Sequence, residues 1–162
     1  MRRVVMTVAA ALVVLGMAGA AQAQVIQMHA VLTGANETPA PGVLTGAFAE
    51  ATVTVDLTAK SVAWIIDVWN MPSGTNNAHF HVGGPGLAGP TVVNIPFPPN
   101  ISNDYRLAGS ATTASTLRPD QGIRSWDDFL QSLLGGQVYL NIHSVLFPGG
   151  EIRGQVHVEG GQ

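Results

Sequence analysis

The fold class is decided by the stretch Thr52-Val53-Thr54-Val55-Asp56-Leu57 and by Ser61-Val62-Ala63-Trp64-Ile65-Ile66-Asp67-Val68, which follows it after a short turn. Successive side chains of a strand point to opposite faces, so every second residue shares a face. In both segments one of the two faces is wholly apolar. This alternation predicts an antiparallel hairpin with one buried side. Its predicted core residues are Val53, Val55, Leu57, Val62, Trp64, Ile66 and Val68.

Six further strand candidates surround this hairpin, separated by turns rich in glycine and proline. One helix is predicted after Ser125, which can cap its N-terminus, with an acidic residue three positions on at Asp128. Apolar residues then recur at helical spacing, and Gly135-Gly136 ends the helix. Many short strands with one late helix predict an all-β fold, an antiparallel Greek-key sandwich or barrel with a short helix near the C-terminal third. The six strand candidates cover residues 25–32, 78–82, 91–95, 104–112, 137–143 and 151–158.

The first 23 residues predict a secretory signal peptide. Met1-Arg2-Arg3 is basic, the run from Val4 to Leu15 is almost wholly apolar, and Ala21-Gln22-Ala23 offers small residues for cleavage. The alternative is an uncleaved membrane anchor, because the apolar run approaches the roughly 20 residues that a spanning helix needs. With cleavage after Ala23, we expect a single domain over residues 24–162, exported to the periplasm or the medium, with no later membrane span.

Composition restricts the partners of this domain. Of seven Lys and Arg residues, two lie in the predicted signal peptide, and the other five stand against ten Asp and Glu. This acidic balance argues against nucleic acid and against an anionic membrane as partners. The chain has no cysteine, which excludes thiol chemistry, disulfides and attachment as a lipoprotein.

Histidines form the candidate metal site. His79 and His81 lie two residues apart in a strand candidate, so both imidazoles project from one face. His143, from another strand candidate with a polar face, would complete a site for one metal ion, with His29 as a fourth ligand to consider. Imidazoles without thiolates suit copper(II) or zinc. The alternative interpretation is structural, with the three imidazoles hydrogen-bonded to loop carbonyls and packed between sheets.

The last two strand candidates are predicted to form a hairpin through Pro148-Gly149-Gly150. When His143 is placed opposite Glu151, the apolar residues of the two strands share one face of the hairpin and the polar residues share the other. Asn141, Glu151 and Arg153 then lie on the polar face beside His143. One interpretation is that they orient an imidazole that binds metal. The other is that Glu151 and Arg153 take part in a cross-strand salt bridge that fixes the register.

Catalytic motifs are not found. The glycine-rich segment 83–90 lacks the Gly-Lys-Ser/Thr sequence and the following helix of a phosphate-binding loop, so it is interpreted as a strand connector. Ser144 follows His143 directly and points to the opposite face of the strand, so this imidazole does not activate it.

Four sequence blocks resemble the CHRD domain, a family named after the secreted animal protein chordin and also found in exported microbial proteins. The resemblance covers about Met28 to Val158, and it departs from the family in Thr38-Pro39-Ala40-Pro41 and in a longer insertion between Asp104 and Gly136. It implies an extracellular all-β domain of immunoglobulin-like or superoxide-dismutase-like character, with no established catalytic activity. The blocks are Leu32-Thr33-Gly34-Ala35-Asn36-Glu37-Thr38-Pro39, Ala78-His79-Phe80-His81-Val82-Gly83-Gly84, Gly89-Pro90-Thr91-Val92-Val93, and Tyr139-Leu140-Asn141-Ile142-His143 with Gly149-Gly150-Glu151-Ile152-Arg153-Gly154-Gln155-Val156.

Two functions follow as hypotheses. The first is a secreted or periplasmic, non-catalytic binding or structural module whose partner is an extracytoplasmic protein or ligand. The alternative is a small metalloprotein, with redox activity to be considered, that holds copper or zinc on His79, His81 and His143.

Overall fold

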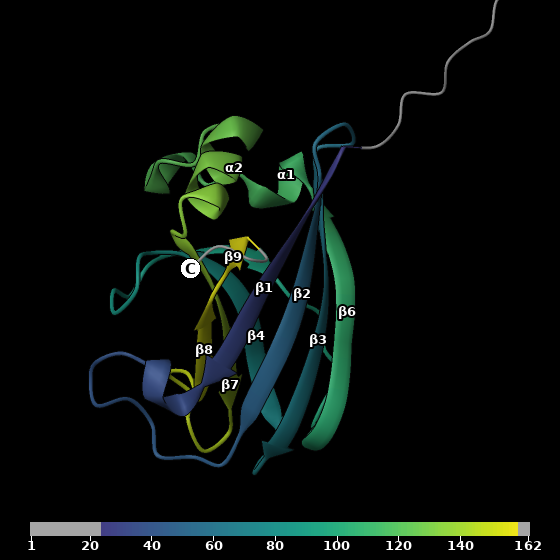
Figure 1. Ribbon diagram of the computed structural model, residues 1–162. Coiled ribbons are helices and arrows are strands. Elements are labelled where there is room, and N and C mark those ends of the chain that lie inside the picture. The colour runs from purple at the N-terminus through teal and green to yellow at the C-terminus, as the bar shows by residue number, and fades with distance from the viewer. Residues whose placement is uncertain (1–23, 159–162) are drawn as a thin grey trace, which may run out of the picture.

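The computed structural model describes residues 24–158 and shows an antiparallel β-sheet that curves into a nearly closed barrel (Figure 1). The predicted signal peptide lies outside these residues. The strands are β1 Val25–Thr33, β2 Phe48–Asp56, β3 Ser61–Met71, β4 Thr75–Val82, β5 Thr91–Asn94, β6 Asn103–Thr112, β7 Val138–Ser144, β8 Ile152–Gln155 and β9 His157–Val158.

Helical structure is confined to short segments between or after strands. The longest is α2, Trp126–Leu134, which Ser125 caps by accepting a hydrogen bond from the Asp128 N–H. Three single turns accompany it, namely η1 Gly34–Asn36, α1 Thr113–Thr116 and η2 Pro119–Gln121. Figure 1 shows α1 and α2 together at one end of the barrel, with the loop after β1 at the other end. Within the described chain, none of the helices has the length and apolar character needed to cross a lipid bilayer.

The order of strands around the barrel is β5-β4-β7-β8-β1-β2-β3-β6, and β9 pairs with β1. All the pairings are antiparallel. The chain crosses the barrel between β3 and β4 and again between β6 and β7, as in Greek-key folds. These crossings bring β4 beside β7, two strands that are far apart in the sequence and that carry the candidate site.

Side chains that alternate into the barrel form one continuous core. The alternating positions of β2 and β3 are buried as the sequence predicts, except that Leu57 lies just beyond β2 and is only half-buried. Trp64 of β3 meets Phe80 of β4 with ring centroids 5.3 Å apart, so the two walls of the barrel touch. Burying these apolar surfaces is the dominant stabilising term of a fold that has no cysteine.

Two of the differences from the sequence-based strand boundaries concern the strands around the candidate site. β4 starts at Thr75 and not at Ala78, because pairing with β7 extends it through polar residues. The final segment is split at Val156, whose N–H donates to the carbonyl of Val138, so β8 and β9 are separate strands. The polar face of β7 also differs, because loops cover it and β7 is buried on both faces.

Candidate metal centre

His79, His81 and His143 come together on one face of the β4–β7 pair. His79 lies opposite Asn141 and His81 opposite Tyr139, so the alternation of both strands places all three imidazoles on the same face. The ring centroids of His79 lie 5.3 Å from those of both His81 and His143, and the other two are 6.4 Å apart. One ring nitrogen of each histidine lies within 4.8 Å of the corresponding atoms of the other two.

Backbone carbonyls orient two of the three rings. Nδ1 of His81 lies 2.9 Å from the carbonyl oxygen of Gly89, and Nδ1 of His143 lies 2.9 Å from that of Pro148. A carbonyl oxygen only accepts hydrogen bonds, so both Nδ1 atoms carry a proton. In the neutral rings, Nε2 therefore holds a free lone pair, as metal-binding imidazoles require.

Each ring also has one buried nitrogen without a partner. Among residues 24–158, no hydrogen bond reaches Nδ1 of His79, Nε2 of His81 or Nε2 of His143, although all three atoms are shielded from solvent. A buried polar atom that lacks a partner costs free energy. One unpaired nitrogen on each of three adjacent rings is the arrangement that a shared ligand would satisfy.

The protonation of the cluster favours neutral rings. Burial, with smaller effects from His81 and His143, lowers the pKa of His79 to about 4. Burial also lowers the pKa of His81, although the hydrogen bond to Gly89 opposes this shift. At neutral pH these two imidazoles are therefore uncharged, and a cation meets less repulsion.

The geometry fits a metal ion after a small contraction. Metal–nitrogen bonds of about 2.0–2.1 Å in a tetrahedral site place two ligand nitrogens about 3.4 Å apart. The ring nitrogens lie within 4.8 Å of one another, so they must approach by up to about 1.4 Å, a shift that the three rings can share. Side-chain rotation supplies such a shift. Three imidazoles and no thiolate match the ligand preferences of copper(II) and zinc.

Tyr139 and Arg153 lie beside the three imidazoles, next to His81. The Tyr139 ring stacks on His81 at 4.8 Å with an interplanar angle of 4°. The Arg153 guanidinium carbon lies 3.5 Å from the centre of the Tyr139 ring. β7 lies between β4 and β8, so Tyr139 is placed between the imidazole and the guanidinium. The sequence places Tyr139 on the correct face, but its ring contacts follow only from the folded arrangement.

The remaining polar residues of the hairpin contact other groups. Asn141 donates from Nδ2 to Oε1 of Glu37 at 2.8 Å, and Glu151 accepts from Thr45 at 2.6 Å. Arg153 lies opposite Asn141 and, within the described chain, forms no ion pair with Glu151. The carbonyls of the loops, and not these side chains, lie within hydrogen-bond distance of the imidazoles.

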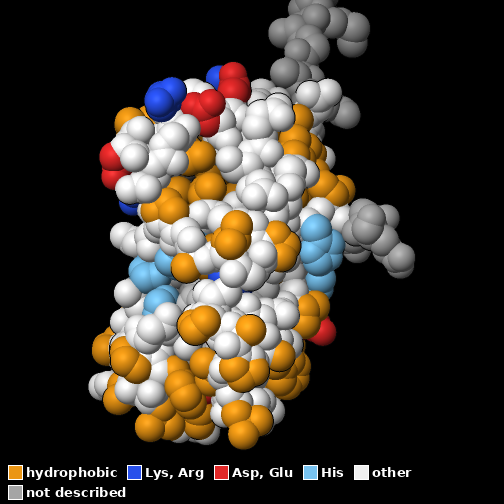
Figure 2. Space-filling model, turned by 90° about the vertical axis from the view of Figure 1, so that its left-hand side faces the viewer, with side chains coloured by type: hydrophobic (Ala, Val, Ile, Leu, Met, Phe, Trp, Pro, Cys, Tyr) orange, Lys and Arg blue, Asp and Glu red, His pale blue; other side chains and the backbone are white. Residues whose placement is uncertain are grey.

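The structure does not bring His29 to the cluster. His29 lies opposite His157 where β1 pairs with β9, and their ring centroids are 6.4 Å apart. Figure 2 shows histidine side chains at two separate places on the surface. The group whose ligand atoms approach each other contains only His79, His81 and His143 among the described residues.

Comparison with known proteins supports the sequence resemblance. A scan against protein-family models matches the CHRD domain over residues 28–156. No curated protein and no solved structure matches the chain. The family match covers most of the sequence and includes the two strands that carry the three imidazoles. The chain therefore belongs to the CHRD domain family.

Proposed function

We propose that this CHRD protein is a non-catalytic module of the extracytoplasmic space that binds one copper(II) or zinc ion through His79, His81 and His143. The observation that supports this function is the set of buried ring nitrogens without partners, one on each imidazole. No group of the described chain satisfies these three atoms. A metal ion would satisfy them together, while the carbonyls of Gly89 and Pro148 hold the rings in the required tautomer.

The basic and apolar residues at the start of the chain support the location, since they have the pattern of a cleaved signal peptide over residues 1–23. We propose binding and not catalysis. Among residues 24–158, no serine, threonine or carboxylate side chain forms a hydrogen bond with the three imidazoles. The groups that usually activate a nucleophile or transfer a proton are therefore not in contact with the site.

Metal titration tests this proposal. Protein purified without an affinity tag and treated with a chelator should bind one Cu(II) or Zn(II) ion per chain in isothermal titration calorimetry. His79→Ala removes one of three ligands and should weaken binding by at least about 100-fold. A competition titration between the two metals identifies the preferred ion.

His29→Ala is the matched control, because His29 contacts His157 and lies outside the cluster. This variant should bind one ion with the affinity of the unmodified protein. The proposal is wrong if micromolar binding that depends on His79, His81 and His143 is not observed, or if His79→Ala binds as tightly as the unmodified protein.

A further inference from the structure

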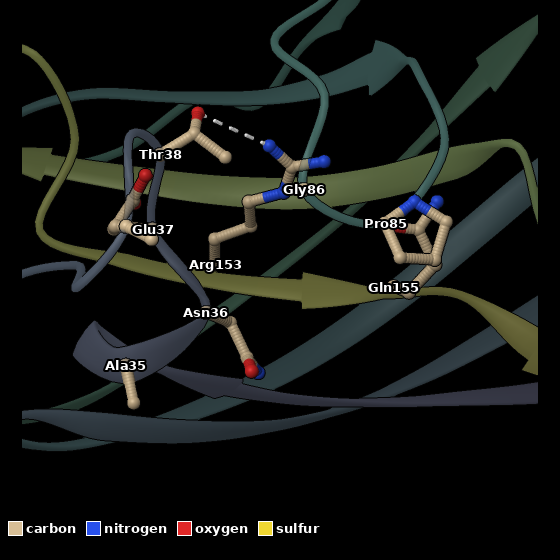
Figure 3. A pocket seen from close by; sticks show the side chains of 9 residues that line it. Ala35, Asn36, Glu37, Thr38, Pro85, Gly86, Arg153 and Gln155 are labelled. Atoms are coloured by element: carbon tan, nitrogen blue, oxygen red, sulfur yellow. Dashed lines mark hydrogen bonds between the residues drawn. The ribbon is translucent and has the colours of Figure 1, made fainter.

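A cavity of about 320 Å³ lies beside the metal centre, between the loop after β1 and the glycine-rich loop after β4. Arg153 and Gln155 of β8 form one wall (Figure 3). The opposite sides come from the two loops, with Glu37, Thr38 and Ala40 on one and Pro85 on the other. The volume is at the lower end of the range for small-molecule sites, about 300–1,000 Å³.

Arg153 is a buried cation that forms no salt bridge among residues 24–158, although its charge acts on the Glu37 carboxyl. It is 2% exposed, and the only ion pair among residues 24–158 joins Arg106 and Asp67. Its guanidinium donates to the carbonyls of Gly84 and Leu87 at 2.9 Å each, and to Oγ1 of Thr38 at 3.4 Å. A guanidinium has five N–H donors, so these three bonds leave part of its capacity unused.

The surroundings of Arg153 favour a charged ligand in the cavity. Burying an isolated charge is costly unless it is paired, and the stack on Tyr139 offsets only part of that cost. Figure 3 shows the guanidinium between Thr38 and Gly86, two residues of the cavity lining. An anion bound there would supply the missing partner.

The other lining residues restrict which anion fits. Arg153 is the single cation of the lining and Glu37 is its one acidic residue, so a singly charged anion is favoured over a dianion such as phosphate. Burial raises the pKa of Glu37, while hydrogen bonds from Asn141 and from the Thr38 backbone and the charge of Arg153 oppose this shift. Ala35, Ala40 and Pro85 give the cavity an apolar part that suits a short carbon chain or ring.

We propose that this cavity binds a small organic monocarboxylate, with its carboxylate on the Arg153 guanidinium and its apolar part against Ala40 and Pro85. This site goes beyond the proposed metal function and does not depend on it. Tyr139 separates the two sites, since it stacks on His81 on one side and on Arg153 on the other.

Binding of defined probes tests the proposal. Butyrate and benzoate are titrated into metal-free protein and followed by NMR, beside the uncharged butyramide and benzamide and beside inorganic phosphate. The carboxylates should bind saturably, and each amide should bind at least about tenfold more weakly than its carboxylate because the charge-assisted hydrogen bond is lost. Equal binding of the amides, tighter binding of phosphate, or no saturable binding of either carboxylate would overturn the proposal.

Variants test whether the carboxylates bind in this cavity. Arg153→Gln should abolish carboxylate binding, but removal of a buried side chain can also disturb folding. Ala40→Phe keeps Arg153 and fills the cavity from an exposed position, so it should abolish binding in a folded protein. Ala59→Phe makes the same change in the exposed turn between β2 and β3 and should leave binding unchanged.

Carboxylate binding that survives in folded Ala40→Phe would exclude this cavity as the site. His79→Ala separates the two proposals, because it removes a metal ligand and leaves the cavity lining intact. This variant should bind the carboxylates with unchanged affinity. Failure of metal binding and failure of carboxylate binding are therefore distinguishable results.

Discussion

The His79 imidazole has a very different proton affinity in the folded and unfolded protein. Burial lowers its pKa to about 4 in the folded state, while in the unfolded chain it titrates near 6.5. Between these two values the unfolded chain binds the proton and the folded protein does not. The contribution of His79 to the free energy of unfolding is therefore fully present above pH 6.5 and is lost as the pH falls from 6.5 to about 4.

The first residue-level prediction concerns this pH dependence. In metal-free protein, His79 should lower the free energy of unfolding by up to about 3 kcal/mol between pH about 7 and about 4. Urea denaturation in the presence of a chelator measures this loss. Glu37 acts in the opposite direction because its pKa is raised, so the quantity to compare is the difference from His79→Gln. If both proteins lose the same stability, His79 does not titrate as the structure indicates.

The sequence is sufficient to predict that His79, His81 and His143 meet, but it wrongly offers His29 as a fourth member and does not show how the rings are held. His79 and His81 share a face because of strand alternation, and His143 follows from the polar face of its hairpin. The carbonyls of Gly89 and Pro148 come from loops, whose paths depend on tertiary contacts and carry no periodic signal. Backbone groups are also the same at every residue, so no residue type marks them in advance.

At the scale of elements, the contact of β8 with β1 depends on a residue without a side chain. A Cβ atom on Gly154 would lie 2.4 Å from the carbonyl oxygen of Val31 and 2.7 Å from its carbon. Both are backbone atoms, which cannot rotate away. β8 carries Arg153 and Gln155 on either side of this glycine, so the close approach also positions the cavity wall.

Gly154→Ala should therefore destabilise the protein by about 2 kcal/mol or more, because β1 and β8 must separate to admit the methyl group. Urea denaturation provides the measurement. Gly149→Ala is the matched control, since a Cβ atom there has nothing within 4 Å, and its effect should be within about 0.5 kcal/mol. Similar stabilities for the two variants would show that β1 moves away freely.

The sequence predicts a strand best where its own alternation of apolar and polar residues matches that of the strand it pairs with. The register of the β7–β8 hairpin is confirmed, with Ile142 opposite Ile152 and Leu140 opposite Gly154. The start of β4 is missed, because Thr75-Asn76-Asn77 has no apolar alternation and becomes a strand only through its pairing with β7. Such long-range pairing is decided by the whole fold and not by the local sequence.

At the scale of the whole molecule, the domain depends on noncovalent packing, and a metal ion would join β4 to β7 within it. A ligand that binds only the folded state stabilises it according to its concentration and affinity. At 100 times the dissociation constant the gain is about 2.7 kcal/mol. For a domain of this size, that corresponds to an increase in Tm of about 10 °C.

Thermal unfolding with and without the preferred ion measures this gain. The increase in Tm should be reversed by a chelator and should be absent in His81→Ala, which lacks one ligand. An equal increase in His81→Ala would assign the stabilisation to another site, such as the pair of half-buried His29 and exposed His157.

The two end strands of the sheet, β5 and β6, do not pair with each other within the described chain, and a cavity of about 290 Å³ lies between them, bordered by Asn94 and Ser110. The barrel is therefore open along one side, between β5 and β6. The outer edges of β5 and β6 have no strand partner within the described chain, whereas β7 is bonded along both of its edges. Amide hydrogen exchange is consequently expected to be faster along β5 and β6 than along β7, the strand that carries His143.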